Sequence, residues 1–232
     1  MIESFRLPFT FEIADLLSDL ENFAGAEWLP HFNTSYYEGD WDGLALRAPG
    51  GKLGSIYPGS ISQKEFADTP WMPHFRSVEK ILETFQCSIT SVRFLRLKRG
   101  SAIREHSDNA LSFEDGEVRL HIPVITNDVI EFKSNGRRLL MKEGECWYIN
   151  AGLPHSVENN SEIDRIHLVI DCKVNDWLKS FFPNEPEIVK NGLSSIRSEK
   201  DRENMIIALR SIGTPAALKI IDDLLHRELT NG

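Results

Sequence analysis

The segment SITSVRFLRL, residues 88–97, alternates between two kinds of side chain, which is typical of a β-strand with two different faces. The same two-residue period continues in the short runs VRLHIPV (118–124), ECWYIN (145–150) and RIHLVI (165–170). Two further runs, 129–132 and 138–141, flank Asn135-Gly136, a dipeptide that favours a two-residue hairpin turn. Many short strands at this spacing predict an all-β sandwich or jelly roll, not a parallel α/β sheet.

The regions on either side of this β region have a different character. Residues 1–85 form a mixed α/β segment, with helical spacing at 11–17 and 78–85 and an aromatic-rich, glycine-punctuated stretch at 36–47. After a connection at 173–186, the apolar spacing predicts two helices near the C-terminus. We therefore expect one domain over residues 1–183 and a helical extension over 184–232, which packs on the β region or forms a homodimer contact.

The composition excludes several classes of protein. The chain has 232 residues, 41% hydrophobic and 26% charged, with a net charge of −9, and these values are ordinary for a folded globular protein. An acidic chain without a dense Lys/Arg run is a poor candidate for binding nucleic acid or an anionic membrane. No signal peptide is visible, and no apolar run approaches the length of a membrane span.

The cysteines fit a cytoplasmic location. Cys87, Cys146 and Cys172 are far apart and form no CxxC motif. We interpret them as reduced thiols of a cytosolic protein, not as a zinc site or a disulfide framework.

A candidate metal site begins at His106-Ser107-Asp108, shortly after the strand at 88–97. Residues two apart on an extended segment point to the same side, so His106 and Asp108 converge on one point. His155 follows another strand, and strand ends of this kind meet at the mouth of a β-barrel. Two histidines and one carboxylate form the facial triad of non-heme Fe(II) oxygenases. Taken singly, His106 is better explained as an ordinary surface loop histidine and His155 as an ordinary turn histidine.

Arg165 provides a second indication of function. It begins an otherwise apolar strand and shares one strand face with His167 and Val169. A buried arginine is costly unless it meets an anion, and a guanidinium holds a carboxylate through two hydrogen bonds. The distal carboxylate of a 2-oxo acid would provide such an anion for Arg165. The alternative is an edge-strand arginine in solvent.

Four motifs in this order resemble the aspartyl/asparaginyl β-hydroxylase family of Fe(II)/2-oxoglutarate dioxygenases. They are His106-Ser107-Asp108, Arg119-Leu120-His121-Ile122-Pro123, Leu153-Pro154-His155 and the strand 165–171. The similarity covers about residues 25–172, and the segment 28–47 looks like that of the free-standing bacterial members. The resemblance implies a double-stranded β-helix, a cupin-like jelly roll, and a requirement for Fe(II), 2-oxoglutarate and O2.

The resemblance also implies a role for each motif residue. It makes His106, Asp108 and His155 the iron ligands and Arg165 the partner of the 2-oxoglutarate distal carboxylate. Arg119 and His121 match a pair that touches co-substrate or substrate acids, although His121 is also consistent with a core histidine. Where family relatives place a small polar residue, this chain has Leu95, which puts the detailed co-substrate contacts in doubt.

The strand pattern adds two candidates for the substrate pocket. Arg93 shares a strand face with Leu95 and Leu97 and is a candidate to hold a substrate carboxylate. Trp41 is a candidate pocket wall, with ordinary packing as its alternative. Arg93, Arg119 and His121 would be unpaired cations inside the barrel, which is expensive. We therefore expect at least one of them to meet a substrate acid.

The function expected is hydroxylation of an aliphatic carbon in a small carboxylate-bearing molecule, most simply a free amino acid. A peptidyl or carrier-bound substrate is one alternative. A cupin-type metal-dependent isomerase or lyase, which would not need Arg165, is another, and a non-catalytic cupin-like binding module, which would not need the full ligand set, is a third.

Overall fold

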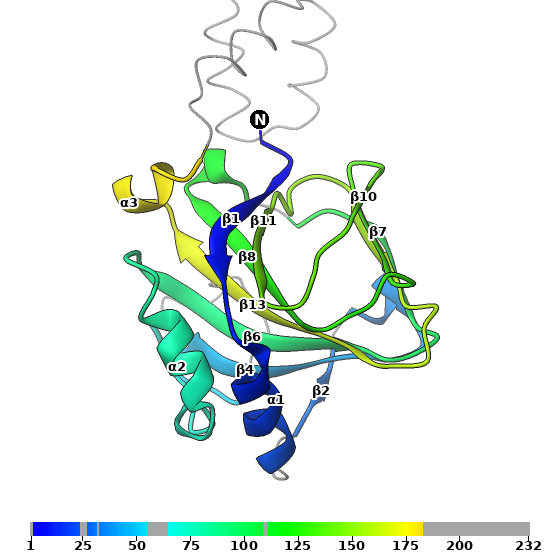
Figure 1. Ribbon diagram of the computed structural model, residues 1–232, viewed down its shortest axis with the longest axis horizontal. Coiled ribbons are helices and arrows are strands. Elements are labelled where there is room, and N and C mark those ends of the chain that lie inside the picture. Colours follow the sequence, from blue (N-terminus) through cyan, green and yellow to red (C-terminus); the bar gives the residue numbers. More distant parts are fainter. Residues whose placement is uncertain (1, 24–26, 32, 55–64, 109–110, 183–232) are drawn as a thin grey trace, which may run out of the picture. The chain divides into compact units, whose positions relative to one another are not determined.

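The computed structural model describes residues 2–23, 27–31, 33–54, 65–108 and 111–182, and residues 2–182 form one compact unit. Its strands form two antiparallel sheets (Figure 1). The mainly β double-stranded β-helix expected from the sequence is confirmed for these residues. The expected helical extension and homodimer contact at 184–232 lie outside the described residues, so the domain boundary there stays a prediction.

The large sheet has eight strands. Its order is β1 (Ser4–Thr10), β11 (Glu145–Ile149), β8 (Glu117–Ile125), β13 (Arg165–Lys173), β6 (Ile89–Leu97), β4 (Trp41–Pro49) and β2 (Leu29–Pro30), with β5 (Phe66–Asp68) paired to β4. Its β4, β6, β8, β11 and β13 each contribute residues that line the pocket.

The small sheet has five strands and carries two of the candidate metal ligands, His106 and His155. Its order is β10 (Arg137–Leu139), β9 (Glu131–Ser134), β12 (His155–Glu158), β7 (Ala102–His106) and β3 (Tyr37–Glu38).

Helices cover the outer face of the large sheet. α1 (Ile13–Asn22) and α2 (Arg76–Leu82) lie side by side there (Figure 1), and α3 (Asp176–Lys179) follows the last strand. Phe75, which precedes α2, packs against Phe94 of β6 with ring centroids 5.4 Å apart. Leu168, on the β13 face that alternates with Arg165 and His167, is fully buried. This outer cover explains why both faces of β13 are buried, although only the inner face carries polar groups.

The inner faces of the two sheets share a compact apolar core. Its buried members are Trp41, Leu97, Ile103, Ile130, Phe132, Ile149 and Val157, which come from both sheets. Burial of this surface holds the sheets together and leaves a pocket beside the core.

The predicted hairpin is present, with its strands closer to the turn than expected. Strand β9 ends at Ser134 and β10 begins at Arg137. Asn135 and Gly136 have φ values of 48° and 73°, the left-handed conformation that a type I′ turn requires. The two strands therefore run directly into the two-residue turn.

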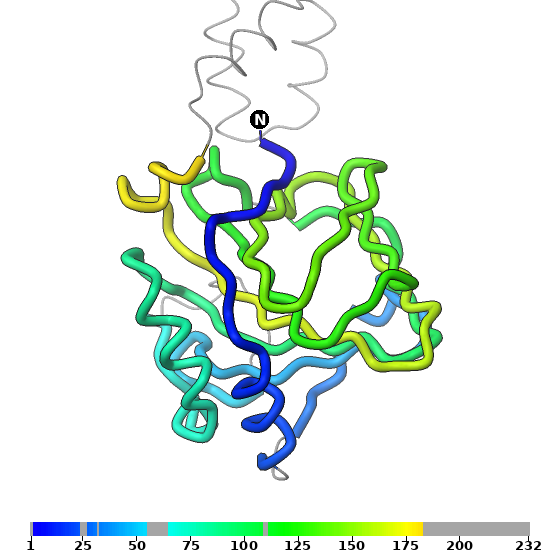
Figure 2. Tube along the Cα trace, in the orientation of Figure 1, coloured from blue at the N-terminus to red at the C-terminus, as the bar shows by residue number. Residues whose placement is uncertain are grey.

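The N-terminal segment is part of the barrel. Figure 2 shows its blue end running alongside the green β11, and Phe5 is the register partner of Tyr148. The aromatic-rich stretch after residue 36 becomes β4, which pairs with β6 through Leu44 and Phe94. The mixed segment expected before residue 85 thus supplies strands to the large sheet as well as helices.

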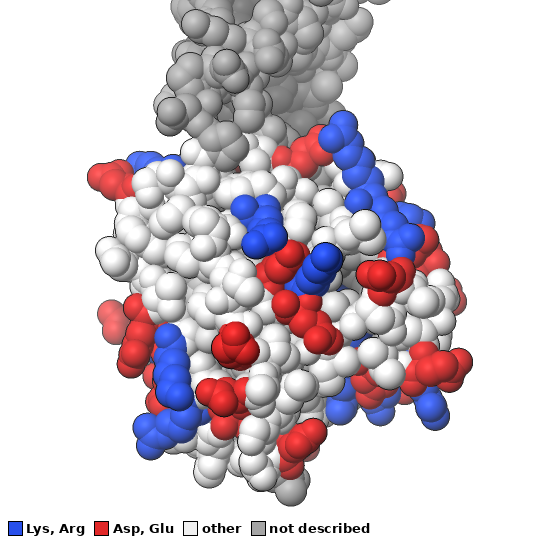
Figure 3. Space-filling view, in the orientation of Figure 1, with Lys and Arg blue, Asp and Glu red and all other residues white. Residues whose placement is uncertain are grey.

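Figure 3 shows acidic and basic side chains in scattered groups on this face, with uncharged surface between them. Within the part of the chain that the structure describes, no helix is long and apolar enough to cross a membrane. Cys87, Cys146 and Cys172 are free thiols, as predicted from their spacing.

Candidate metal centre

Three potential metal ligands lie together at one end of the pocket. His106 ends β7, Asp108 follows it, and His155 begins β12. One ligand atom from each of them lies within 4.8 Å of the others. His106 and His155 are register partners on neighbouring strands of the small sheet. The pairing of β7 with β12 therefore brings together residues that are far apart in the sequence.

Backbone hydrogen bonds orient both imidazoles. Nδ1 of His106 lies 2.8 Å from the carbonyl oxygen of Arg104, and Nδ1 of His155 lies 2.9 Å from that of Leu153. Because a carbonyl oxygen only accepts, Nδ1 is the donor in each contact, and Nε2 is the ring nitrogen left to face a metal. This second hydrogen bond is the arrangement usually found around metal-binding histidines.

The protonation states also suit a cation. Burial, together with the neighbouring His106, lowers the pKa of His155 to about 4, so the ring is neutral at neutral pH. Burial alone would raise the pKa of Asp108, but Arg119 and His155 outweigh it and lower that pKa. The cluster therefore offers a carboxylate and a neutral imidazole, which are the forms that bind metal.

Arg119 holds the carboxylate of Asp108 in place. Its Nη1 donates to Oδ2 of Asp108, and the backbone N–H of Asp108 donates to the carbonyl oxygen of Ala151 at 2.8 Å. Arg119 also donates from Nε to Oδ1 of Asp171 at 2.9 Å. Both carboxylates are thus engaged by the same guanidinium.

The expectation of unpaired cations inside the barrel is wrong for Arg93 and Arg119. Arg93 donates to Oδ2 of Asp171 at 2.9 Å and does not line the pocket, so nothing in its surroundings fits the expected substrate contact. Asp171 was missed by the sequence reasoning. It lies six residues after Arg165, and the period of two places both on the inner face of β13.

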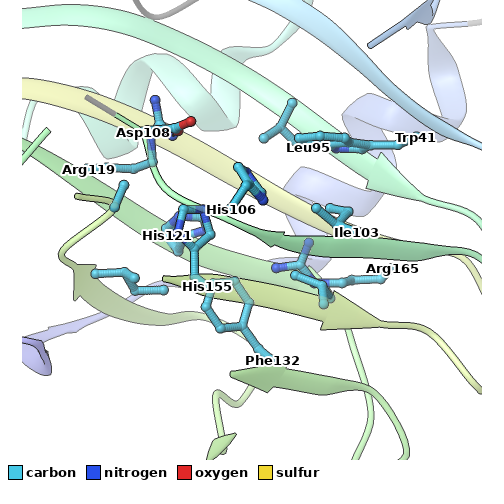
Figure 4. A pocket seen from close by; sticks show the side chains of 13 residues that line it. Trp41, Leu95, Ile103, His106, Asp108, Arg119, His121, Phe132, His155 and Arg165 are labelled. Carbon is cyan, nitrogen blue, oxygen red and sulfur yellow. The ribbon is translucent and has the colours of Figure 1, made fainter. Parts of the chain in front are cut away.

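Arg165 lies at the other end of the pocket, as Figure 4 shows. It is 3% exposed, and no carboxylate among the described residues pairs with it. Its Nη2 lies 3.0 Å from Nδ1 of His167, and its guanidinium lies 5.5 Å from the centre of the Phe132 ring. Burial without a neutralising acid lowers its pKa. Arg165 therefore presents a charged guanidinium group to the pocket.

His121 and Trp41 also line the pocket, and each has one ring N–H or nitrogen without a hydrogen-bond partner in the described part of the chain. The atoms are Nδ1 of His121 and Nε1 of Trp41, and both residues are buried. Burial and the charge of Arg165 hold the pKa of His121 well below its ordinary value. Buried polar atoms usually find a partner, so both are suited to contact a ligand.

Apolar and aromatic side chains complete the wall. Tyr36 stacks on His106 with ring centroids 4.8 Å apart, and His31 stacks on Trp41 at 3.7 Å. Leu95 and Ile103 line the space between the two ends. Aromatic and aliphatic side chains therefore surround the candidate ligands on this side of the pocket.

Comparison with known proteins gives matches over most of the chain. Residues 11–174 match the family described as Aspartyl/Asparaginyl beta-hydroxylase. The L-proline cis-4-hydroxylase of Rhizobium meliloti (strain 1021) is 30% identical over 179 residues, 75% of this chain. The chain spans 62% of the length of that curated relative.

One solved structure supports the fold. An oxidoreductase of the 2OG-Fe(II) oxygenase family from Burkholderia pseudomallei superimposes with a TM-score of 0.50 at 17% identity. The match covers 74% of this chain and 86% of that one.

Proposed function

The chain belongs to the aspartyl/asparaginyl β-hydroxylase family, and from this premise we propose that it is an Fe(II)- and 2-oxoglutarate-dependent hydroxylase. His106, Asp108 and His155 would hold the iron. Two imidazoles and one carboxylate fit the facial triad that leaves positions open for co-substrate and oxygen. The bound iron, with 2-oxoglutarate and O2, would supply the chemistry that replaces an aliphatic C–H by C–OH.

Arg165 carries the co-substrate part of the proposal. A buried guanidinium that no described carboxylate neutralises lies in the same pocket as the three ligands. A dianion that chelates the metal at one end would bring its second carboxylate to this fork. His167 would fix the guanidinium, since its Nδ1 lies 3.0 Å from Nη2 of Arg165.

A small, carboxylate-bearing substrate, in the simplest case a free amino acid, is the finer part of the proposal. The similarity of the chain to an L-proline cis-4-hydroxylase supports this substrate class. The apolar lining by Leu95 and Ile103 suits an aliphatic carbon, and Nε1 of Trp41 could donate to a substrate oxygen. Arg93 and Arg119 no longer support it, because Asp171 and Asp108 already neutralise them.

Succinate formation from 2-oxoglutarate tests the activity directly. The wild type with Fe(II) should form succinate aerobically, and His106→Ala should not. Arg165→Ala should raise the KM for 2-oxoglutarate about ten- to a hundredfold, because a charge-assisted pair is worth about 1.5–3 kcal/mol. Arg165→Lys should recover only part of this, since an ammonium offers no fork. An unchanged KM in Arg165→Ala would contradict the co-substrate role of Arg165, whereas a wild type that forms no succinate would favour a cupin-type isomerase or lyase.

The substrate is tested by pairing each amino acid with its amide. Acids should stimulate 2-oxoglutarate turnover and gain one oxygen atom by mass, whereas amides should be poorer. Equal stimulation by the amides, or stimulation only by internal peptides, would replace the free amino acid with a peptidyl or carrier-bound substrate.

A further inference from the structure

Asp171 lies at the centre of a buried charge network that ends at a candidate metal ligand. We propose that Asp171 is a positioning residue for the metal centre, acting through Arg119 on the carboxylate of Asp108. The inference rests on the proposed function, because it presumes that Asp108 ligates a metal. It adds a residue that touches neither the metal nor the pocket.

Asp171 binds two of the three guanidinium nitrogens of Arg119, and the third binds Asp108. Nε and Nη2 of Arg119 donate to Oδ1 and Oδ2 of Asp171 at 2.9 and 3.3 Å. This side-on fork leaves Nη1, which donates to Oδ2 of Asp108. With two of its nitrogens fixed, the guanidinium can present the third in one direction only, and Oδ1 of Asp108 stays available for the metal.

The network is built on the rigid centre of the large sheet. Asp171 on β13 is the register partner of Arg119 on β8 and of Ser91 on β6. Arg93, also on β6, donates from Nη1 to Oδ2 of Asp171 at 2.9 Å and to Oγ of Ser91 at 2.6 Å. Three adjacent strands therefore hold the carboxylate of Asp171, which is fully buried.

Charge gives Asp171 a second effect on the site. Arg119 places a positive charge beside a site that must receive a divalent cation, which by itself lowers metal affinity. Asp171 offsets that charge. Burial alone would raise the pKa of Asp171, but Arg119 and Arg93 hold it at about 2, so the carboxylate is ionised throughout the neutral range.

The test measures Co(II) binding to the full chain in the absence of 2-oxoglutarate. Titration gives the Co(II) affinity, and the visible d–d spectrum reports the coordination of the bound ion. Asp171→Asn keeps the shape of the side chain and removes its charge. Mutation of residues that orient metal ligands typically weakens metal affinity about ten- to a hundredfold, and we expect a loss in this range together with a changed d–d spectrum. Wild-type affinity and spectrum in Asp171→Asn would overturn the proposal, even if the variant melts at a lower temperature.

The matched control is Asp42→Asn. Asp42 accepts two hydrogen bonds from Arg96, at 2.9 and 2.6 Å, in the same sheet but with no link to Asp108. It tests the loss of an arginine–carboxylate pair alone, so Co(II) affinity and spectrum should stay as in the wild type. Weakened Co(II) binding in this control to the same extent would also overturn the proposal.

A double variant keeps the test usable if Asp171→Asn does not fold. Arg93→Met/Asp171→Asn removes one buried charge of each sign and so restores the charge balance of the network. Arg119 still loses its charged anchor, so Co(II) affinity should remain below that of the wild type. Full wild-type Co(II) binding in the double variant would contradict the proposal.

Failure of the underlying function gives a different result. If His106→Ala binds Co(II) as tightly as the wild type, the metal is not at the proposed site and the proposed function fails. If His106→Ala loses Co(II) but Asp171→Asn does not, only the role of Asp171 fails.

Discussion

Arg165 has a buried charge that a ligand is expected to neutralise, so the stability of the protein should report that ligand. With Co(II) in place of iron, 2-oxoglutarate at a hundred times its Kd should stabilise the wild type by about 2.7 kcal/mol. At the same concentration, Arg165→Ala should gain only about 0.4–1.4 kcal/mol, since its Kd is about ten- to a hundredfold weaker.

Thermal unfolding with and without 2-oxoglutarate measures this difference. Arg96→Ala is the control, because Arg96 pairs with Asp42 and does not line the pocket. Its ligand-induced shift should equal that of the wild type. An equal shift in Arg165→Ala would show that the guanidinium does not bind the co-substrate.

Asp171 should also make the stability of the protein depend on pH in the acid range. Its pKa is about 2 in the folded protein and 3.8 ordinarily, so the folded state favours the ionised form. A depressed pKa gives stability that is fully present above the ordinary pKa and is lost as pH falls from about 4 toward 2. The contribution is about 2 kcal/mol.

Urea unfolding at several pH values between 5 and about 2 tests this linkage. Asp171→Asn should lose less stability over this range than the wild type, while Asn in place of the exposed Asp40 should leave the slope unchanged. A wild-type slope in Asp171→Asn would mean that Asp171 does not keep its low pKa.

Particular residues show how far the sequence predicts the site. His106, Asp108, His155 and Arg165 were identified by motif and strand parity, and the structure brings all four to one pocket. The two-residue alternation also placed Arg93 and Arg119 inside the barrel, but it could not predict that the carboxylate of Asp171 lies between them. That depends on the pairing of β13 with both β8 and β6, which is a long-range property.

At the level of elements, regular alternation was the reliable signal. The strands near 88–97, 118–124 and 165–170 were predicted because their residues alternate without interruption, and β6, β8 and β13 follow. Strand β1 was missed although Phe5, Leu7 and Phe9 alternate regularly, because Pro8 argues against a strand; β1 is an edge strand, where proline is tolerated. Strands β7 and β12 have only five and four residues, too few to show a period.

Two glycines allow a matched test of the loops that join these strands. Gly136 and Gly144 both have positive φ, 73° and 78°. A Cβ at Gly136 would meet nothing within 4 Å, whereas one at Gly144 would lie 2.3 Å from the carbonyl oxygen of Phe11. Gly136→Ala should therefore cost about 1 kcal/mol from backbone strain alone.

Gly144→Ala should cost more, because the backbone that links β1 to this loop must also move. Urea unfolding of the two variants compares them directly. Equal losses would show that the chain near Phe11 gives way without cost.

For the whole molecule, the barrel and the metal centre are expected to be separable. The candidate ligands are held by backbone hydrogen bonds and by Arg119, and the core between the sheets lies beside them. His106→Ala should therefore leave the metal-free unfolding free energy within about 0.5 kcal/mol of the wild type.

Leu168→Ala provides the contrast, because Leu168 is fully buried on the helix-covered face. Removing it should cost about 2–5 kcal/mol. Urea unfolding in the presence of a chelator measures both variants. A loss in His106→Ala as large as that in Leu168→Ala would mean that His106 is part of the structural core.

The proposed pocket would bind Fe(II) through His106, Asp108 and His155 and 2-oxoglutarate through Arg165. Anaerobic titration of the Fe(II)-loaded protein with 2-oxoglutarate tests both at once, because chelation of Fe(II) by a 2-oxo acid produces a visible charge-transfer absorption. We expect a saturable band in the wild type, the same band at about ten- to a hundredfold higher 2-oxoglutarate in Arg165→Ala, and no band in His106→Ala. Absence of the band in the wild type, or an identical titration in His106→Ala, would contradict this proposal.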